Sequence, residues 1–115
     1  MTYGRGDIVL VDLEPTIGSE QGFKRPCIVV SNLPTITASR SRPLYVIVPL
    51  TRSEKLTGKL APRLKAREGG LPADSTALVM HMRSVDPRRI IRKVGRLEAG
   101  ELNMIQEGLQ ELLQF

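Results

Sequence analysis

The sequence predicts a mainly β protein, a small and strongly bent β-barrel against which a C-terminal helix packs. Short apolar, β-branched segments recur as far as Met82, and turn-forming residues separate them. The one convincing amphipathic helical pattern comes at the end of the chain. Several short strands followed by one packing helix favour such a barrel. With 115 residues the chain can bury one core, so we expect a single domain over residues 1–115.

Four segments carry a strand pattern dense in Val, Ile and Leu. They are residues 7–13, 25–31, 45–51 and 76–82. The first ends at Glu14-Pro15, because proline cannot donate to a central ladder. Polar loops rich in Gly, Pro, Ser and Thr follow the first two strands, over residues 16–24 and 32–43. Residues 59–64 could add an edge strand, which Pro62 and its neighbouring cations suit.

The last part of the chain predicts a helical turn and then a helix. Asp86 and Pro87 suit the cap and the first position of a short turn over residues 87–90. Residues 98–113 predict a helix whose apolar stripe comprises Leu102, Ile105, Leu109 and Leu112. Its N-cap is poor, and Gly108 lowers its stability by roughly 1 kcal/mol, so packing must hold it.

Positive charge is concentrated in the middle of the chain. The formal net charge is +5, yet residues 38–67 hold eight Lys or Arg against Glu54 alone, and residues 83–96 hold six against Asp86. The last nineteen residues contain four Glu and no Lys or Arg. A basic patch suits a polyanion such as nucleic acid, although solubility alone would also account for it. An aromatic content of 3% argues against a broad base-stacking platform.

Several classes of protein and site are excluded. No apolar run approaches the ~18 residues of a membrane span, and the N-terminal residues lack a signal-peptide pattern, so we expect a soluble cytoplasmic protein that needs no membrane. Cys27, the only cysteine, is expected to be a buried thiol. Without a Cys/His cluster, an acidic triad or a phosphate-binding loop, no metal or cofactor is expected. His81 has no Gly-x-Ser-x-Gly partner that would indicate a hydrolase triad.

The loop over residues 18–26 offers the most promising chemistry. Metal-free RNA cleavage needs a group that accepts the 2′-hydroxyl proton, a cation for the negative phosphorane, and a donor to the leaving 5′ oxygen. Glu20 could be the first and Arg25 the second, and the Thr51 hydroxyl could bond a non-bridging phosphate oxygen. A surface ion pair between Glu20 and Arg25, worth ~0–1 kcal/mol, is the competing interpretation.

Six segments together resemble the MazF/PemK toxins of bacterial type II toxin–antitoxin systems. They are DIVLVDLEP (7–15), GSEQ (18–21), KRPCIVVSN (24–32), VPLT (48–51), GLPADS (70–75) and RSVDPRR (83–89). The resemblance runs essentially end to end, and the acidic helix closes the chain as in that family.

The resemblance implies a sequence-specific, metal-independent endoribonuclease that needs no cofactor. Such toxins cleave single-stranded RNA, chiefly messenger RNA, by attack of the 2′-hydroxyl, and so inhibit translation and growth. They leave a 2′,3′-cyclic phosphate and a 5′-hydroxyl. The implied fold is an SH3-like barrel with helices, which forms a homodimer with RNA across its groove. A cognate MazE-like antitoxin would cover that face with an extended acidic C-terminal tail.

The resemblance also implies roles for individual residues. Arg25 and Thr51 match catalytic positions, and Glu20 matches a loop carboxylate linked less directly to catalysis. Ser19, Gln21 and Ser75 match RNA-contacting positions. Beside these, we expect RNA contacts from Lys24, Arg52, Lys59, His81 and Arg83. His81 stands where relatives commonly have Gln, and its imidazole could bond a base, join the acid–base chemistry or only line the groove.

Two other functions remain to be compared with RNA cleavage. A gyrase poison of the CcdB-like type would use a related barrel, but those toxins rely on a Trp near the C-terminus, and this chain has no Trp. A non-catalytic nucleic-acid-binding barrel would need only the cations, and it would show salt-dependent affinity without cleavage.

Overall fold

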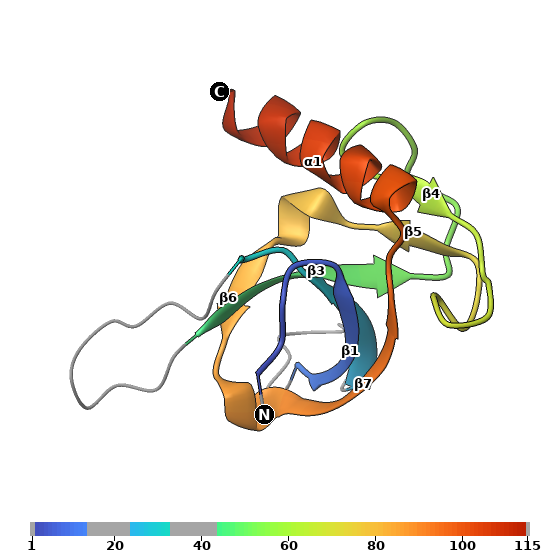
Figure 1. The fold of residues 1–115 in the computed structure, drawn as a ribbon. Coiled ribbons are helices and arrows are strands. Elements are labelled where there is room, and N and C mark those ends of the chain that lie inside the picture. The colour runs from blue at the N-terminus through green and yellow to red at the C-terminus, as the bar shows by residue number, and fades with distance from the viewer. Residues whose placement is uncertain (1, 14–23, 33–43, 115) are drawn as a thin grey trace.

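The computed structural model describes residues 2–13, 24–32 and 44–114 (Figure 1). Within these ranges the strands are β1 (Asp7–Asp12), β2 (Lys24–Val29), β3 (Tyr45–Thr51), β4 (Arg63–Leu64), β5 (Ser75–Ala77), β6 (Arg83–Val85) and β7 (Ile90–Arg96). Helix α1 spans Ala99–Leu113, and two 3₁₀ turns span Val79–His81 and Pro87–Arg89. The expected class, mainly β with a C-terminal helix, is confirmed.

The strands form one antiparallel sheet that curls on itself. Their order is β4-β5-β3-β2-β1-β7, and β6 pairs with β3 beside this path. Strand β3 therefore pairs with β2, β5 and β6, which makes it the centre of the sheet. Figure 1 shows β1, β2 and β7 curving into the barrel, while β4 and β5 extend to one side.

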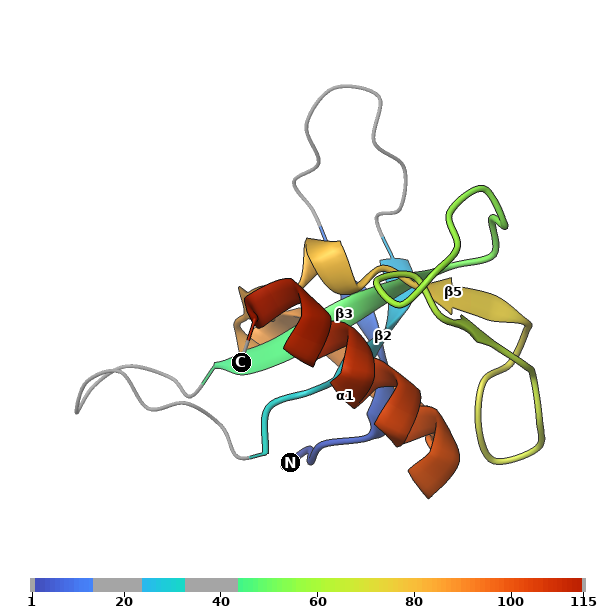
Figure 2. The ribbon, with the colours of Figure 1, turned by 90° about the horizontal axis from the view of Figure 1, so that it is seen from above.

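The two faces of the curled sheet bury two separate cores. Alternation along β3 sends Ile47 into the barrel interior, where it packs with Cys27 and other residues of β1 and β2. It sends Val48 and Leu50 to the opposite face, where they pack with Ile105 of α1. Seen from above, α1 lies across this second face, over β2 and β3 (Figure 2).

Helix α1 follows its predicted bounds, but its N-terminus is better capped than the sequence indicates. The Glu101 carboxylate accepts the Glu98 N–H at 2.8 Å, as half of a reciprocal capping box. The prediction of a poor cap was wrong because it looked only for Ser, Thr, Asp or Asn. The apolar stripe packs as expected, with Ile105 buried and Leu102, Leu109 and Leu112 partly buried against the same core.

At Gly108, helix α1 lies close against the segment before β4. A Cβ added there would lie 2.6 Å from the Lys59 carbonyl oxygen and 3.1 Å from a Val79 methyl group. This glycine lowers helix propensity, but it also permits the close approach of helix and loop.

Three of the four predicted strands are confirmed, and the fourth was predicted too long. Strand β5 ends at Ala77, and residues 79–81 form a 3₁₀ turn. The chain turns there because Val79 N–H donates to the Leu60 carbonyl and His81 N–H donates to that of Leu78. The suggested edge strand over residues 59–64 is reduced to β4, at the end of the sheet.

Strands β6 and β7 were not predicted from the sequence. Their exposed cations conceal the alternation of apolar residues, and two register shifts in the β1–β7 pairing disturb it further. The turn between them was predicted correctly: the Asp86 carboxylate accepts the Arg88 N–H at 2.8 Å, with Pro87 at the first position.

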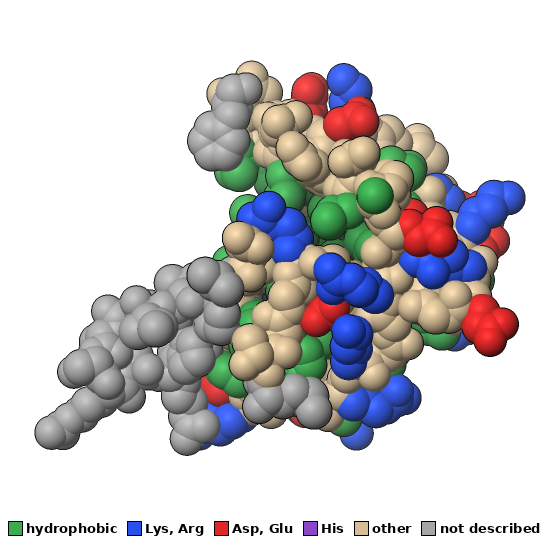
Figure 3. All heavy atoms as spheres, in the orientation of Figure 1, with side chains coloured by type: hydrophobic (Ala, Val, Ile, Leu, Met, Phe, Trp, Pro, Cys, Tyr) green, Lys and Arg blue, Asp and Glu red, His purple; other side chains and the backbone are tan. Residues whose placement is uncertain are grey.

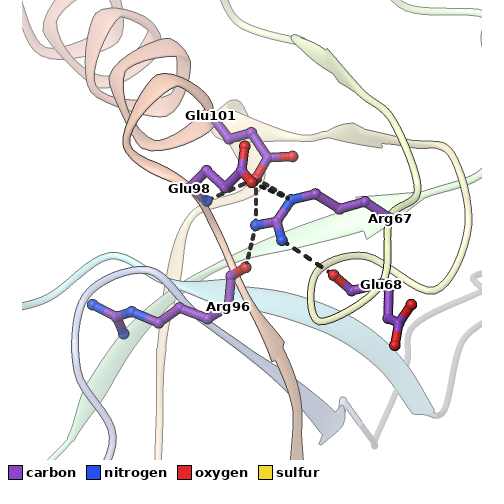
Figure 4. A network of polar contacts seen from close by, with 5 residues as sticks. All are labelled: Arg67, Glu68, Arg96, Glu98 and Glu101. Carbon is purple, nitrogen blue, oxygen red and sulfur yellow. Dashed lines mark hydrogen bonds and ion pairs between the residues drawn. The ribbon is translucent and has the colours of Figure 1, made fainter.

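A polar network fixes the loop over residues 66–71 against the start of α1 (Figure 4). The Arg67 guanidinium donates to the Arg96 carbonyl at 2.6 Å and to the Glu101 carboxylate at 3.0 Å. Arg67 thereby joins the loop to β7, and the Glu101 carboxylate, which also caps the helix, joins the loop to α1. In the described ranges, no helix has both the length and the apolar character of a membrane span.

Candidate functional site

A row of polar side chains crosses the sheet where β3 ends. Thr76 of β5 pairs with Thr51 of β3 on one side and with Arg63 of β4 on the other. Residues directly opposite in antiparallel strands project to the same face. The three side chains therefore lie side by side, on the face that continues the barrel interior, since Thr51 has the same parity as Ile47.

Arg25 extends this row onto β2. The β2–β3 register pairs Cys27 with Pro49, and continuing it by two residues places Arg25 opposite Thr51. On its other side Arg25 pairs with the buried Val11 of β1. Continued in this way, the register puts Arg25 and Thr51, both half-buried, at neighbouring strand ends on one face.

The Thr51 hydroxyl is held by its own turn. Its oxygen accepts the Ser53 N–H at 3.2 Å. A hydroxyl that accepts in this way keeps its proton for donation to another acceptor. Beside Arg25, such an arrangement suits the non-bridging oxygens of a phosphodiester, because a guanidinium and a neutral donor can share a developing negative charge.

The Cys27 thiol lies near two arginines at this end of the barrel. Burial raises its pKa to about 12, while the nearby Arg25 and Arg83 oppose that shift. Cys27 is fully buried, so the prediction of an inert thiol in the core is confirmed. Arg83 is opposite Ile47 in the β3–β6 pairing, which puts a second guanidinium on the face of Arg25.

The remaining candidate residues are distributed around this row. Lys24 and Arg52 are exposed next to Arg25 and Thr51 in the chain. His81 is exposed and, with Leu56 and Met80, lines a hollow of about 180 Å³.

Ser75 and Lys59 have neighbours that sequence reasoning did not anticipate. Ser75 is buried, and its hydroxyl donates to the Ala73 carbonyl at 2.8 Å. Lys59 is exposed beside α1 and lines a hollow of about 510 Å³ with Met104 and Glu107. The predictions for Glu20, Ser19 and Gln21 concern residues outside the described ranges.

Sequence reasoning missed Arg63 and Thr76. They are thirteen positions apart in the sequence, and only the pairing of β4 with β5 and of β5 with β3 brings them beside Thr51. In the sequence Arg63 is one of eight cations between residues 38 and 67, and nothing local distinguishes it from the others.

Cations dominate the barrel surface below α1. In Figure 3, Lys and Arg side chains gather on this face, while hydrophobic side chains line the hollow beneath the helix. That hollow, of about 290 Å³, is lined by Val30, Leu102 and Leu109 among others. This face therefore presents a positive region and, next to it, a mainly apolar groove that Arg5 also lines.

Comparisons with known proteins point to one family. A model described as "PemK-like, MazF-like toxin of type II toxin-antitoxin system" matches residues 4–113. The chain is 37% identical over 108 residues to endoribonuclease MazF9 of Mycobacterium tuberculosis (strain ATCC 25618 / H37Rv), covering 92% of each chain. It is 30% identical over 111 residues to endoribonuclease EndoA of Bacillus subtilis (strain 168), covering 96% of this chain and 93% of the relative.

Solved structures show the same fold. MazF from Deinococcus radiodurans superposes with a TM-score of 0.76 at 25% identity, covering 100% of this chain and 99% of its own. An endoribonuclease in complex with its cognate antitoxin, from a mycobacterial species, superposes with a TM-score of 0.75 at 18% identity, covering 98% and 96%.

Proposed function

Because this chain belongs to the PemK-like, MazF-like toxins of type II toxin–antitoxin systems, we propose that it is an endoribonuclease that cleaves single-stranded RNA. The observation that carries the proposal is the placement of Arg25 and Thr51 at neighbouring strand ends, to which the β2–β3 register extends. The exposed cations Lys24, Arg52 and Arg83 lie close to them in the chain or on the same face of the sheet. Its substrate is chiefly messenger RNA, and cleavage at specific sequences inhibits translation and growth.

The proposed reaction is a transesterification that needs no metal. The 2′-hydroxyl oxygen attacks the adjacent phosphorus, the bond from phosphorus to the 5′ oxygen breaks, and the products are a 2′,3′-cyclic phosphate and a 5′-hydroxyl. The Arg25 guanidinium stabilises the negative phosphorane, and the Thr51 hydroxyl donates to one of its non-bridging oxygens. The 2′-hydroxyl proton passes to a base, for which Glu20 is our candidate, and the 5′ oxygen takes up a proton as it leaves.

The molecules that we expect this chain to bind follow from its toxin family and from its positive charge. We propose that two copies form a homodimer with RNA across the groove between them, and that residues 1–115 act as one toxin domain, which the match over residues 4–113 supports. A cognate antitoxin, the kind of partner present in the mycobacterial complex, is the third partner. Its acidic side chains cover the cations around Arg25 and so inhibit the toxin. Messenger RNA as substrate implies action in the cytoplasm.

Cleavage of RNA in excess EDTA tests the function directly. Several long single-stranded RNAs of different sequence, labelled at the 5′ end, should give discrete fragments that end in 2′,3′-cyclic phosphate. Arg25→Ala and Thr51→Ala should each lower the cleavage rate by about 10²–10³-fold, because each removes a donor to the transition state.

The two variants should keep their circular dichroism and still bind the antitoxin. Normal cleavage by both would refute the assignment of the site. Binding of RNA without cleavage by the unaltered chain would instead favour a non-catalytic binding barrel.

A further inference from the structure

The turn after β3 is fixed by a guanidinium and a hydroxyl from two other strands. Nη1 of Arg63 donates to Oγ1 of Thr76 at 3.0 Å. The same nitrogen donates to the carbonyl oxygens of Arg52 at 3.0 Å and Ser53 at 3.2 Å. The Thr76 hydroxyl in turn donates to the Ser53 carbonyl at 3.0 Å. Four hydrogen bonds therefore join β4, β5 and the turn.

Two of these four bonds end on Ser53, the residue whose N–H bonds the Thr51 hydroxyl. Ser53 N–H donates to Oγ1 of Thr51, while the Ser53 carbonyl is bonded by both Arg63 and Thr76. Ser53 itself is exposed, so neighbouring side chains do not restrain it by burial. Its orientation, and with it the anchor of the Thr51 oxygen, depends on this pair of donors.

Thr76 is built into the sheet for such a role. It has no exposed surface, and it lies directly between Thr51 and Arg63 in the register. A buried hydroxyl is costly unless it is bonded, and this one accepts from Arg63 and donates to Ser53. The two hydrogen bonds of Thr76 therefore offset the free-energy cost of burying its hydroxyl at the strand end beside Thr51.

We propose that Thr76 and Arg63 are positioning residues for the Thr51 hydroxyl, fixing its rotamer through the Ser53 peptide. The inference rests on the proposed function, because it assigns Thr51 a phosphate oxygen as its acceptor. Neither residue touches the RNA; they act by holding a donor in the geometry that the phosphorane needs. A misplacement of about 1 Å can cost on the order of 10²-fold in rate.

Two substitutions of Thr76 distinguish the effect of its hydroxyl group on the cleavage rate from the effect of its packing. Thr76→Val keeps the shape and removes the bonds, so the single-turnover cleavage rate should fall about 10- to 100-fold with half-saturation by RNA nearly unchanged. Thr76→Ser keeps the hydroxyl and should restore most of the rate.

The effect of Thr76→Val should also be measured in a chain that already carries Thr51→Val. If Thr76 acts only through Thr51, adding Thr76→Val to Thr51→Val should cost no further rate, whereas independent effects would multiply. A multiplied loss, or an unchanged rate in Thr76→Val alone, would overturn the inference.

Arg63 has a matched control four residues away. Arg63→Lys keeps the charge and loses the shared bonds to the turn, so it should lower the rate with little change in RNA half-saturation. Arg67→Lys breaks an equally rich arginine network at the start of α1, so it should lower stability but leave the rate unchanged. Equal rates for both variants would contradict the role of Arg63.

A measurement independent of cleavage distinguishes this inference from the proposed function. Three-bond couplings across χ1 should report one Thr51 rotamer in the unaltered chain and an average of rotamers in Thr76→Val. If the unaltered chain cuts no RNA but these couplings behave as expected, the function fails and the positioning stands. If the couplings are unchanged in Thr76→Val, the positioning fails, whatever the rate.

Discussion

At the scale of single residues, the buried polar side chains that the structure describes are paired. In the part that the structure describes, the buried polar side chains are Asp7, Ser75 and Thr76, and each has a hydrogen-bond partner. The Asp7 carboxylate accepts the Gly4 N–H at 2.9 Å, contacts the Lys93 ammonium at 3.2 Å and forms an ion pair with Arg96. It thereby joins the turn before β1 to β7.

Asp7 should make the stability of the protein depend on pH in the acid range. Burial opposes ionisation of the carboxyl, but the bonds from Gly4, Lys93 and Arg96 outweigh it and lower the pKa from its ordinary value of 3.8. A lowered folded-state pKa stabilises the protein fully above the unfolded value, and this contribution is lost as pH falls through the folded value. Asp7→Asn should therefore lower the free energy of unfolding by about 1–3 kcal/mol at pH 7. The difference in stability between this variant and the unaltered chain should become smaller below pH ~4.

Urea unfolding at pH 7 and pH 3 measures this difference. Glu111→Gln, an exposed position on α1, is the control and should be near neutral at both values. An Asp7→Asn deficit that stayed constant over the whole range would show that the carboxylate charge is not responsible.

At the scale of elements, α1 depends on close packing more than on helix propensity. Its buried residues are Ile105 and Gly108, and Gly108 lies against the Lys59 carbonyl. The helix also closes the network in which Glu101 bonds both Arg67 and its own N-terminus. Helix α1 is thus held at its N-terminus by the hydrogen bonds and ion pair of Glu101, and in its middle by the close packing of Gly108.

Two glycines of α1 should respond to alanine in opposite directions. At Gly108 the helix-propensity gain of about 1 kcal/mol is outweighed by a Cβ 2.6 Å from a backbone oxygen, so Gly108→Ala should destabilise by about 1–3 kcal/mol. At Gly100 nothing lies within 4 Å of an added Cβ, so Gly100→Ala should stabilise by up to about 1 kcal/mol. Thermal unfolding of both variants measures this; stabilisation by Gly108→Ala would contradict the close approach.

At the scale of the whole molecule, charge is divided between the barrel and the helix. The cations of residues 83–96 lie mainly on β6, β7 and the turn between them, whereas the four Glu after residue 97 lie on α1 or just before it. An anionic strand would therefore be attracted to the barrel rather than to the helix.

RNA binding should weaken with salt. A 2′-O-methyl oligonucleotide lacks the attacking hydroxyl and so reports binding alone. Its affinity by fluorescence anisotropy should fall about tenfold or more between 50 and 200 mM NaCl, because contacts with phosphates release counterions. An oligonucleotide of the same sequence with uncharged methylphosphonate linkages should lose this dependence. Salt-independent affinity of the charged strand would exclude the cations as its main contacts.

The candidate site was predictable in part. Arg25 and Thr51 were identified from their segments, and the β2–β3 pairing then placed them on neighbouring strands. Arg63 and Thr76 could not be found this way, because nothing local marks a residue whose role comes from a partner thirteen positions away. Of the expected RNA contacts, Ser75 proved to be buried and bonded to Ala73.

The sequence alone determined the elements whose apolar residues recur with a clear period, namely β1, β2, β3 and α1, together with the concentration of charge and the buried Cys27. Periodicity is a local property, so it can be recognised without knowing what packs where. Only the tertiary structure decided the rest: that β3 pairs with three strands, that β7 closes the barrel beside β1, and that Gly108 meets Lys59. These depend on contacts between distant residues, whose hydrogen bonds and close approaches leave no pattern along the chain.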